Sequence, residues 1–215
     1  MDRLRPDSAA ELQRLGVRRR FAAGTTLFLE GDVAHEAVVL LAGEVKVSVG
    51  SVEGREVILD VFEPGVLLGE LSVIDGRPRS ATVSALSPVE VLAVATGAFN
   101  SFLDRHPDVL RGLLVEVIDR LRTRAHHQME FGTGDALGRI CARLAELADR
   151  SGEIDGNVAV VRSPVSQTDL AAWTGLSREA VVKALRTLRR LGWAENRGRT
   201  ITIHDLERVR ERAVR

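Results

Sequence analysis

The 215-residue sequence has a single cysteine, Cys141. One thiol cannot form an intrachain disulfide, and it cannot supply the four thiolates of an iron–sulfur cluster. Cys141 lies in the helical pattern of residues 140–144. We interpret it as a small buried apolar side chain, with a redox-sensing thiol as the alternative.

Long apolar runs are also missing. No run of 18 or more apolar residues occurs, which excludes a membrane-spanning helix. Charged residues interrupt the N-terminus, so it has no apolar signal-peptide core. We therefore expect a cytoplasmic protein with no membrane partner. The length of 215 residues allows one large domain or two small domains. The interrupting residues are Asp2, Arg3, Arg5, Asp7 and Glu11.

The formal net charge is zero, but it is unevenly distributed. Residues 135–215 carry 15 Lys and Arg against 11 Asp and Glu, whereas residues 1–134 carry 15 against 19. An acidic part followed by a basic part indicates a sensor joined to a nucleic-acid binder.

Hydrophobic periodicity divides the chain. Short β-branched runs at 38–41, 45–49, 57–61, 81–86 and 89–94 alternate with Gly and acidic turns, which predicts a small barrel or jelly roll. From residue 107 to 131 the apolar residues recur at helical spacing. This helix either packs on its own domain or forms a parallel coiled-coil-like seam with a second copy.

Two closely spaced glycines in Phe131–Gly134 predict a hinge that breaks this helix. A second helix is expected over 135–150, then a loop over 151–157 and a strand over 158–162. The overall prediction is an α+β protein with a sensor at 1–106, a helix and hinge at 107–134, and a third region at 135–215.

Residues 69–82 gather the side chains suited to a small phosphorylated ligand. Glu70 can accept from a ribose 2′-hydroxyl, Arg79 can hold a phosphate with its planar fork, and Ser80 can donate to it. Backbone N–H groups near Gly69 and Glu70 add an anion-binding nest if a short helix starts there. We interpret the stretch as a cyclic-nucleotide site; the alternative is a structural Glu70–Arg79 ion pair in a pocket without a ligand.

Residues 166–203 have the capping and turn residues of a winged helix-turn-helix. Ser166 and Asp169 fit a capping box, Thr174–Gly175 fits the turn between two helices, and Ser177 fits the N-cap of a second helix over 178–191. The segment from 193 to 203 predicts a hairpin, the wing, with a basic tip.

The start of this second helix carries residues that can read bases. An arginine pairs with guanine N7 and O6, and a glutamate accepts from cytosine N4. A solvated helix face is the alternative, and Arg186, Arg189 and Arg190 either contact the DNA backbone or keep the surface wet. The predicted DNA-binding residues are Gln167, Thr168, Ser177, Arg178, Glu179, Lys183, Arg197 and Arg199.

From Phe21 to Asp205 the chain resembles the family of the bacterial cyclic-AMP receptor protein and the fumarate-nitrate regulator. The resemblance implies a cyclic-nucleotide-binding β-roll, a dimerisation helix and a winged helix-turn-helix that reads a TGTGA-like palindrome. It implies double-stranded DNA, a second copy of the chain and RNA polymerase, through the 151–157 loop, as partners. The motifs are Gly24, Leu27, Glu30–Gly31, Leu41–Val45, Glu53–Glu56, Gly69–Thr82, Gly138–Ile140 and Leu176–Val181.

The resemblance also assigns the ligand site. It implies cyclic AMP as the effector, held by Gly69, Glu70, Leu71, Arg79 and Ser80, with Arg120 bracing the glutamate. Arg124 and Ala125 stand where the family has hydroxyl side chains against the adenine. Arg124 can instead stack on a base or pair with guanine, so a regulator that is independent of a ligand or senses another nucleotide is the alternative.

No enzyme is expected, because the sequence has no nucleophile–base pair, metal cluster or phosphate-transfer loop. No metal, haem or iron–sulfur cluster is expected either. His126 and His127 are adjacent, and neighbouring helical residues point about 100° apart, so they cannot share one haem site.

Overall fold

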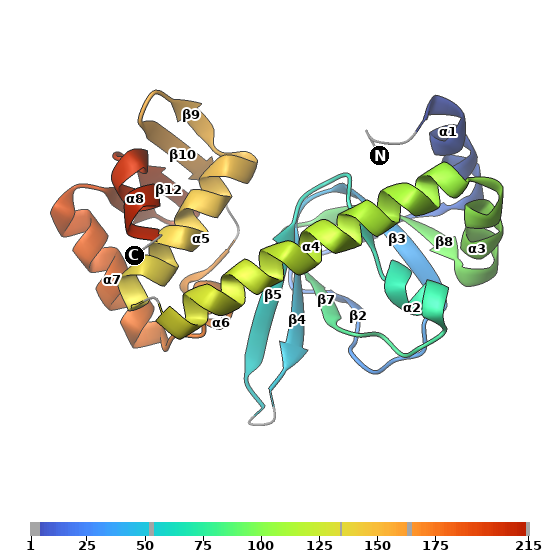
Figure 1. Ribbon diagram of the computed structural model, residues 1–215, viewed down its shortest axis with the longest axis horizontal. Helices are drawn as coiled ribbons and strands as arrows, with labels where there is room; N and C mark the ends of the chain where they lie inside the picture. The colour runs from blue at the N-terminus through green and yellow to red at the C-terminus, as the bar shows by residue number, and fades with distance from the viewer. Residues whose placement is uncertain (1–4, 52–53, 134, 163–164, 214–215) are drawn as a thin grey trace. The chain divides into compact units, whose positions relative to one another are not determined.

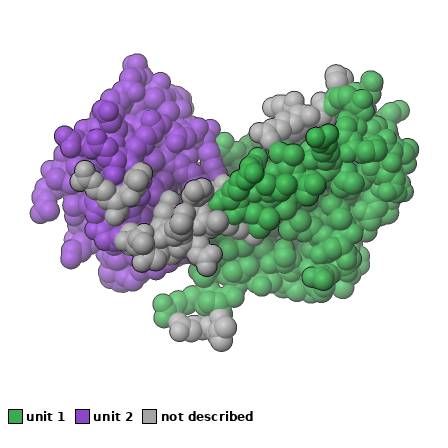
Figure 2. All heavy atoms as spheres, viewed as in Figure 1, with its two compact units in different colours: residues 1–122 green, residues 123–215 purple. Residues whose placement is uncertain are grey.

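The computed structural model describes residues 5–51, 54–133, 135–162 and 165–213, with residues 6 and 123–133 described by their backbone alone (Figure 1). The chain divides into two compact units, one up to residue 122 and one from residue 123 (Figure 2).

The first unit is built from two antiparallel four-stranded sheets, with strand orders β1-β8-β3-β6 and β2-β7-β4-β5. These sheets confirm the predicted β-roll, and each β-branched run is a strand. The elements are α1 (Pro6–Leu15), β1 (Val17–Phe21), β2 (Thr26–Phe28), β3 (Glu36–Ala42), β4 (Val45–Gly50), β5 (Glu56–Phe62), β6 (Leu67–Leu68), α2 (Glu70–Asp75), β7 (Thr82–Ala85), β8 (Val89–Ala95), α3 (Thr96–Arg105) and α4 (Pro107–Thr133).

Strand β3 is buried on both faces, which explains its continuous apolar run. Val38 and Leu40 join a cluster with residues from β4, β7 and β8, whereas Ala37 and Val39 join a second cluster with residues of α1, α3 and α4. Alternate side chains of a strand point to opposite faces, so one strand supports both cores. The start of β3 is thereby held rigidly beside the 69–82 segment.

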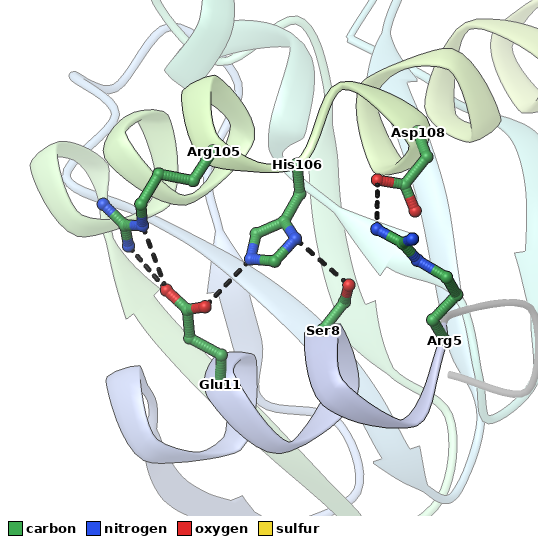
Figure 3. Close-up of polar contacts among 6 residues, drawn as sticks. All are labelled: Arg5, Ser8, Glu11, Arg105, His106 and Asp108. Atoms are coloured by element: carbon green, nitrogen blue, oxygen red, sulfur yellow. Dashed lines mark hydrogen bonds and ion pairs between the residues drawn. The ribbon is translucent and has the colours of Figure 1, made fainter.

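Helix α1 is fastened to the junction between α3 and α4 by a polar cluster (Figure 3). His106 lies 3.1 Å from Ser8 Oγ through Nδ1 and 2.9 Å from Glu11 Oε2 through Nε2. Arg105 also donates to Glu11, at 2.6 Å. Serine, histidine and glutamate occur together in hydrolases, but Ser8 is only 1% exposed and presents no nucleophile to a substrate. The cluster therefore has a structural role.

The first turns of α4 pack on their own unit through one side and leave apolar side chains exposed on the other. Val109 is buried in the hydrophobic cluster that contains Ala37 and Val39, and Leu113 packs against that cluster. One side of the helix therefore covers its own unit. The other side leaves large apolar side chains exposed: Leu110, Leu114, Val115, Ile118 and Leu121.

Helix α4 ends at Thr133, within the segment Phe131–Gly134 that was predicted to break it, but it continues through the first of the two glycines, Gly132. A single glycine inside a helix costs only about 1 kcal/mol relative to alanine, which the bonded turns around it can sustain.

In the described residues of the second unit, a sheet of strand order β11-β12-β10-β9 is accompanied by four helices besides the end of α4. The predicted 151–157 loop contains strand β9, which pairs with β10. Its three residues are too few to show a strand period in the sequence. Helix α8 was not predicted and packs against α5. The elements are α5 (Ala136–Ser151), β9 (Glu153–Asp155), β10 (Val158–Arg162), α6 (Gln167–Thr174), α7 (Arg178–Leu191), β11 (Ala194–Arg197), β12 (Thr200–Ile203) and α8 (Leu206–Ala213).

Cys141 lies inside this unit and is fully buried. Burial raises the pKa of its thiol to about 12. A thiol that stays protonated at neutral pH is a poor nucleophile, so Cys141 acts as a core residue, in agreement with our interpretation.

Among the described residues, no helix combines the length and apolar character needed to cross a bilayer.

Candidate ligand-binding and DNA-binding sites

The carboxylate of Glu70 is buried at the start of α2. Gly69 precedes it with φ of 77°, which turns the chain from β6 into the helix. Glu70 is only 3% exposed, and its Oε1 lies 2.9 Å from Nη1 of Arg120 on α4. Arg120 also contacts the Leu67 carbonyl at 3.1 Å and Glu116 at 2.6 Å. The contact expected between Arg120 and Glu70 is therefore present.

Burial raises the pKa of Glu70, and the positive charge of Arg120 opposes that rise. Because Arg120 binds one carboxylate oxygen, the other keeps its lone pairs for a hydroxyl donor. The arrangement suits a sugar hydroxyl better than an anion, since the carboxylate itself is negative.

The guanidinium of Arg79 is buried nearby but does not pair with Glu70. Arg79 is 5% exposed; its Nη1 donates to the Gly69 carbonyl at 2.9 Å and its Nη2 to the Glu36 carbonyl at 2.6 Å. Burial lowers the pKa of Arg79, while the more distant carboxylates of Glu36, Glu70 and Asp32 oppose this. The alternative of a Glu70–Arg79 ion pair is thus wrong, because Arg120 takes the carboxylate.

The remaining predicted ligand residues surround this pair. Leu71 is 42% exposed on α2, and Ser80 is exposed directly after Arg79. Sequence reasoning missed Phe28 and Glu36, which contact Arg79 through an aromatic ring and a backbone carbonyl and therefore carry no recognisable motif. The side chains of Arg124, Ala125, His126 and His127 lie outside the described residues.

Replacing Gly69 by alanine is expected to disturb the site more than the same change at Gly76. Both glycines flank α2 with positive φ, but a Cβ at Gly69 would overlap the Arg79 guanidinium and the Phe28 ring, whereas a Cβ at Gly76 would meet no atom of the described residues within 4 Å. We expect Gly76→Ala to lower the free energy of unfolding by about 1 kcal/mol and Gly69→Ala by about 2–4 kcal/mol. Urea denaturation of the two variants measures this; equal losses would contradict the overlap.

The two helices of the predicted helix-turn-helix have the predicted caps. Ser166 and Asp169 form the capping box of α6, and Gly175 takes φ of 64° in the turn. The Ser177 hydroxyl accepts from the backbone N–H of Ala180 at 3.2 Å and begins α7, which ends at Gly192 with φ of 72°. The helix packs through Val181, Ala184 and Leu188, while Leu185, predicted to face inward, is half-buried.

The opposite face of α7 is exposed and hollowed. Side chains of Arg178, Glu179, Val182, Lys183 and Arg186 line an open depression of about 480 Å³. The backbone N–H of Glu179 and the Ser177 hydroxyl lower the pKa of the Glu179 carboxyl, so it is an ionised acceptor at neutral pH.

Two further groups of predicted DNA-binding residues lie in this unit. Gln167 is half-buried and Thr168 exposed at the first turn of α6. The hairpin β11–β12 carries Arg197 and Arg199, both exposed, on either side of Gly198, and Arg197 lies 3.4 Å from Glu195. This places basic side chains at the tip of a wing.

Comparison with known proteins identifies a domain family for each of the two regions. A cyclic nucleotide-binding domain matches residues 18–106, and a Crp-like helix-turn-helix domain matches residues 138–212. The chain is 31% identical over 193 residues to a CRP-like cAMP-activated global transcriptional regulator of Mycobacterium tuberculosis, covering 90% of this chain and 86% of the relative.

Two other relatives agree. The cAMP-activated global transcriptional regulator CRP of Escherichia coli O157:H7 is 28% identical over 190 residues, covering 86% of this chain and 88% of the relative. The solved structure of a CRP-family transcriptional regulator from Thermus thermophilus superposes with a TM-score of 0.76 and 26% identity, covering 92% and 97% of the two chains. The chain therefore belongs to the CRP/FNR family and is a transcription regulator, not an enzyme, with a cyclic nucleotide-binding domain and a helix-turn-helix DNA-binding domain.

Proposed function

We propose that this regulator is a homodimer whose affinity for DNA is set by cyclic AMP. The observation that carries the proposal is the buried guanidinium of Arg79, which binds two neutral carbonyls and, within the described part of the chain, no carboxylate. A buried cation of this kind favours an anion, and a phosphate matches its fork. The names of the relatives from M. tuberculosis and E. coli, both described as cAMP-activated, support the same effector.

The two buried charges divide the ligand between them. Arg79 binds the cyclic phosphate, helped by the Ser80 hydroxyl, and Glu70 accepts from the ribose 2′-hydroxyl. Gly69 allows α2 to begin against the phosphate, while the exposed Leu71 lies beside the sugar. The positive charge of Arg120, 2.9 Å from Glu70, favours the ionised form of the carboxyl for this task.

The exposed side of α4 supports dimerisation. The apolar residues Leu110, Leu114, Ile118 and Leu121 recur at steps of three or four, and Leu114 and Leu121 are each 59% exposed. A second copy of the same helix would bury this stripe. Two copies of α7 then meet successive major grooves about 34 Å apart, and the ligand shifts the population toward that spacing.

On DNA, Arg178, Glu179 and Lys183 read a TGTGA-like half-site from the N-terminal turns of α7. Arg197 and Arg199 of the wing, with Ser177 and the first turn of α6 at Gln167 and Thr168, contact phosphates. A carboxylate next to phosphates is repelled unless it accepts from a base, which favours base reading by Glu179.

The proposal is tested by anisotropy titration of a labelled duplex with two inverted TGTGA half-sites, with and without cyclic AMP. We expect cyclic AMP to raise the affinity, and sedimentation to give twice the 23.4 kDa chain mass. Arg178→Ala should weaken cognate binding by about 5- to 150-fold while binding to a scrambled duplex falls far less, since it loses a base contact. Equal losses on both duplexes would reduce Arg178 to a phosphate contact.

A second candidate keeps the regulator but changes its effector. Arg124 and Ala125 supply no hydroxyl to adenine, so a guanine nucleotide or a ligand-independent protein is the competing possibility. Titration with cyclic GMP and a cyclic dinucleotide distinguishes these possibilities. If the protein binds either of them but does not bind cyclic AMP, the effector carries another base.

A further inference from the structure

The ring of Phe28 lies directly against the guanidinium of Arg79. The Cζ atom of Arg79 is 3.7 Å from the ring centroid, and Phe28 is 8% exposed and Arg79 5%. Strand β2 delivers this ring through an irregularity: Thr26 pairs with Ser84, but Phe28 pairs with Val83, so the register shifts by one residue. Such a bulge re-aims side chains, and here Phe28 turns toward Arg79.

The backbone of Arg79 is tied to the loop that follows β2. Its N–H donates to the Asp32 carbonyl at 2.8 Å, and its carbonyl accepts from Gly31 at 2.9 Å. These two hydrogen bonds hold the backbone of Arg79 against the loop that follows β2, which keeps the two residues close to each other.

The guanidinium is held on two edges and one face. Two of its five N–H groups donate to the carbonyls of Gly69 and Glu36, which leaves three for a ligand. The carboxylate of Glu36 is directed elsewhere, to Arg19 at 2.9 Å. The positive charge of Arg79 thus has a fixed plane and an aromatic face beneath it.

We propose that Phe28 is a positioning residue of the phosphate-binding site, which rests on the function proposed above. Its ring attracts the cation and fixes the guanidinium plane, so that the three remaining N–H groups are already oriented when a phosphate arrives. The conformational cost of ordering a long arginine side chain is then met in the ligand-free protein rather than on binding.

The first test needs no ligand. In ¹⁵N-labelled full-length protein, the side-chain N–H signal of Arg79, assigned by its loss in Arg79→Lys, is compared in wild-type, Phe28→Leu, Phe28→Tyr and Phe99→Leu. Phe99 is a buried phenylalanine of the other core cluster, 1% exposed, and serves as the control. We expect Phe28→Leu alone to remove the ring-current shift and to speed rotation of the guanidinium. An Arg79 signal that is unchanged in Phe28→Leu would overturn the proposal.

The second test measures calorimetric affinity for cyclic AMP in the same variants. Phe28→Leu should weaken binding about tenfold, the equivalent of a single desolvated cation–π contact, and Phe28→Tyr should restore it to within about twofold of wild-type. Phe99→Leu should bind like wild-type. Equal affinities of Phe28→Leu and Phe99→Leu would overturn the role of Phe28, whereas a wild-type protein that binds no cyclic nucleotide would overturn the proposed function itself.

Discussion

Replacing Arg79 by alanine is expected to raise the Kd for cyclic AMP by at least about 100-fold. Charge-assisted hydrogen bonds contribute about 1.5–3 kcal/mol each, and a phosphate loses a bidentate pair in this variant. Isothermal titration calorimetry on the purified protein measures the change. Arg79→Lys should recover only part of the affinity, because an ammonium offers a point charge without the planar fork.

Arg77→Ala is the matched control, since Arg77 is exposed two residues earlier on the same turn. We expect its affinity to match wild-type. Arg79→Ala also leaves the carbonyls of Gly69 and Glu36 without their donor, so urea denaturation should accompany the titration and show that the variant is folded. If a folded Arg79→Ala protein bound cyclic AMP with a Kd within tenfold of wild-type, Arg79 would not be the residue that binds the phosphate.

The second large effect is expected for Arg120→Gln. Glu70 is 3% exposed and Arg120 is the cation that contacts it, so the variant leaves a buried carboxylate without its counter-charge. Breaking a buried ion pair in this way costs about 3–5 kcal/mol. The free energy of unfolding at neutral pH should fall by that amount, as measured by urea denaturation.

The loss should depend on pH. Burial already raises the pKa of Glu70 in the wild-type protein, and removing Arg120 raises it further. A raised folded pKa gives stability that is fully present below the unfolded value, about 4.3, and is lost as the pH rises through the folded pKa. The difference between Arg120→Gln and wild-type should therefore be small near pH 4 and greatest above the folded pKa.

Arg122→Gln provides the control for this series. Its side chain is 75% exposed and lies 3.4 Å from Asp119, an exposed pair. Such pairs contribute about 0–1 kcal/mol, and we expect little change at any pH. If Arg120→Gln lost the same free energy at pH 4 as at pH 8, the loss would come from packing and not from the charge of Glu70.

Local interactions made much of the second unit predictable. Ser166 is hydrogen-bonded to Asp169 and Ser177 to Ala180, and in each pair the two residues are three positions apart. Gly175 and Gly192 take positive φ at the ends of the two helices. Caps and turns depend on neighbouring backbone groups, so residue type and spacing suffice to place them. Strands β3, β4, β5, β7 and β8 of the β-roll were likewise visible as β-branched runs, whereas β1, β2 and β6 were not placed and β9 was too short to show a period.

The partners of the buried charges were beyond local reasoning. Residues 69–82 left a Glu70–Arg79 pair open as the alternative. In the structure Glu70 binds Arg120, 50 positions away, and Arg79 binds the Glu36 carbonyl, 43 positions away. The residue types that favour ligand chemistry can be read along the chain. Which of them meet depends on how distant strands and α4 pack, because a buried charge takes whichever partner the core brings within reach.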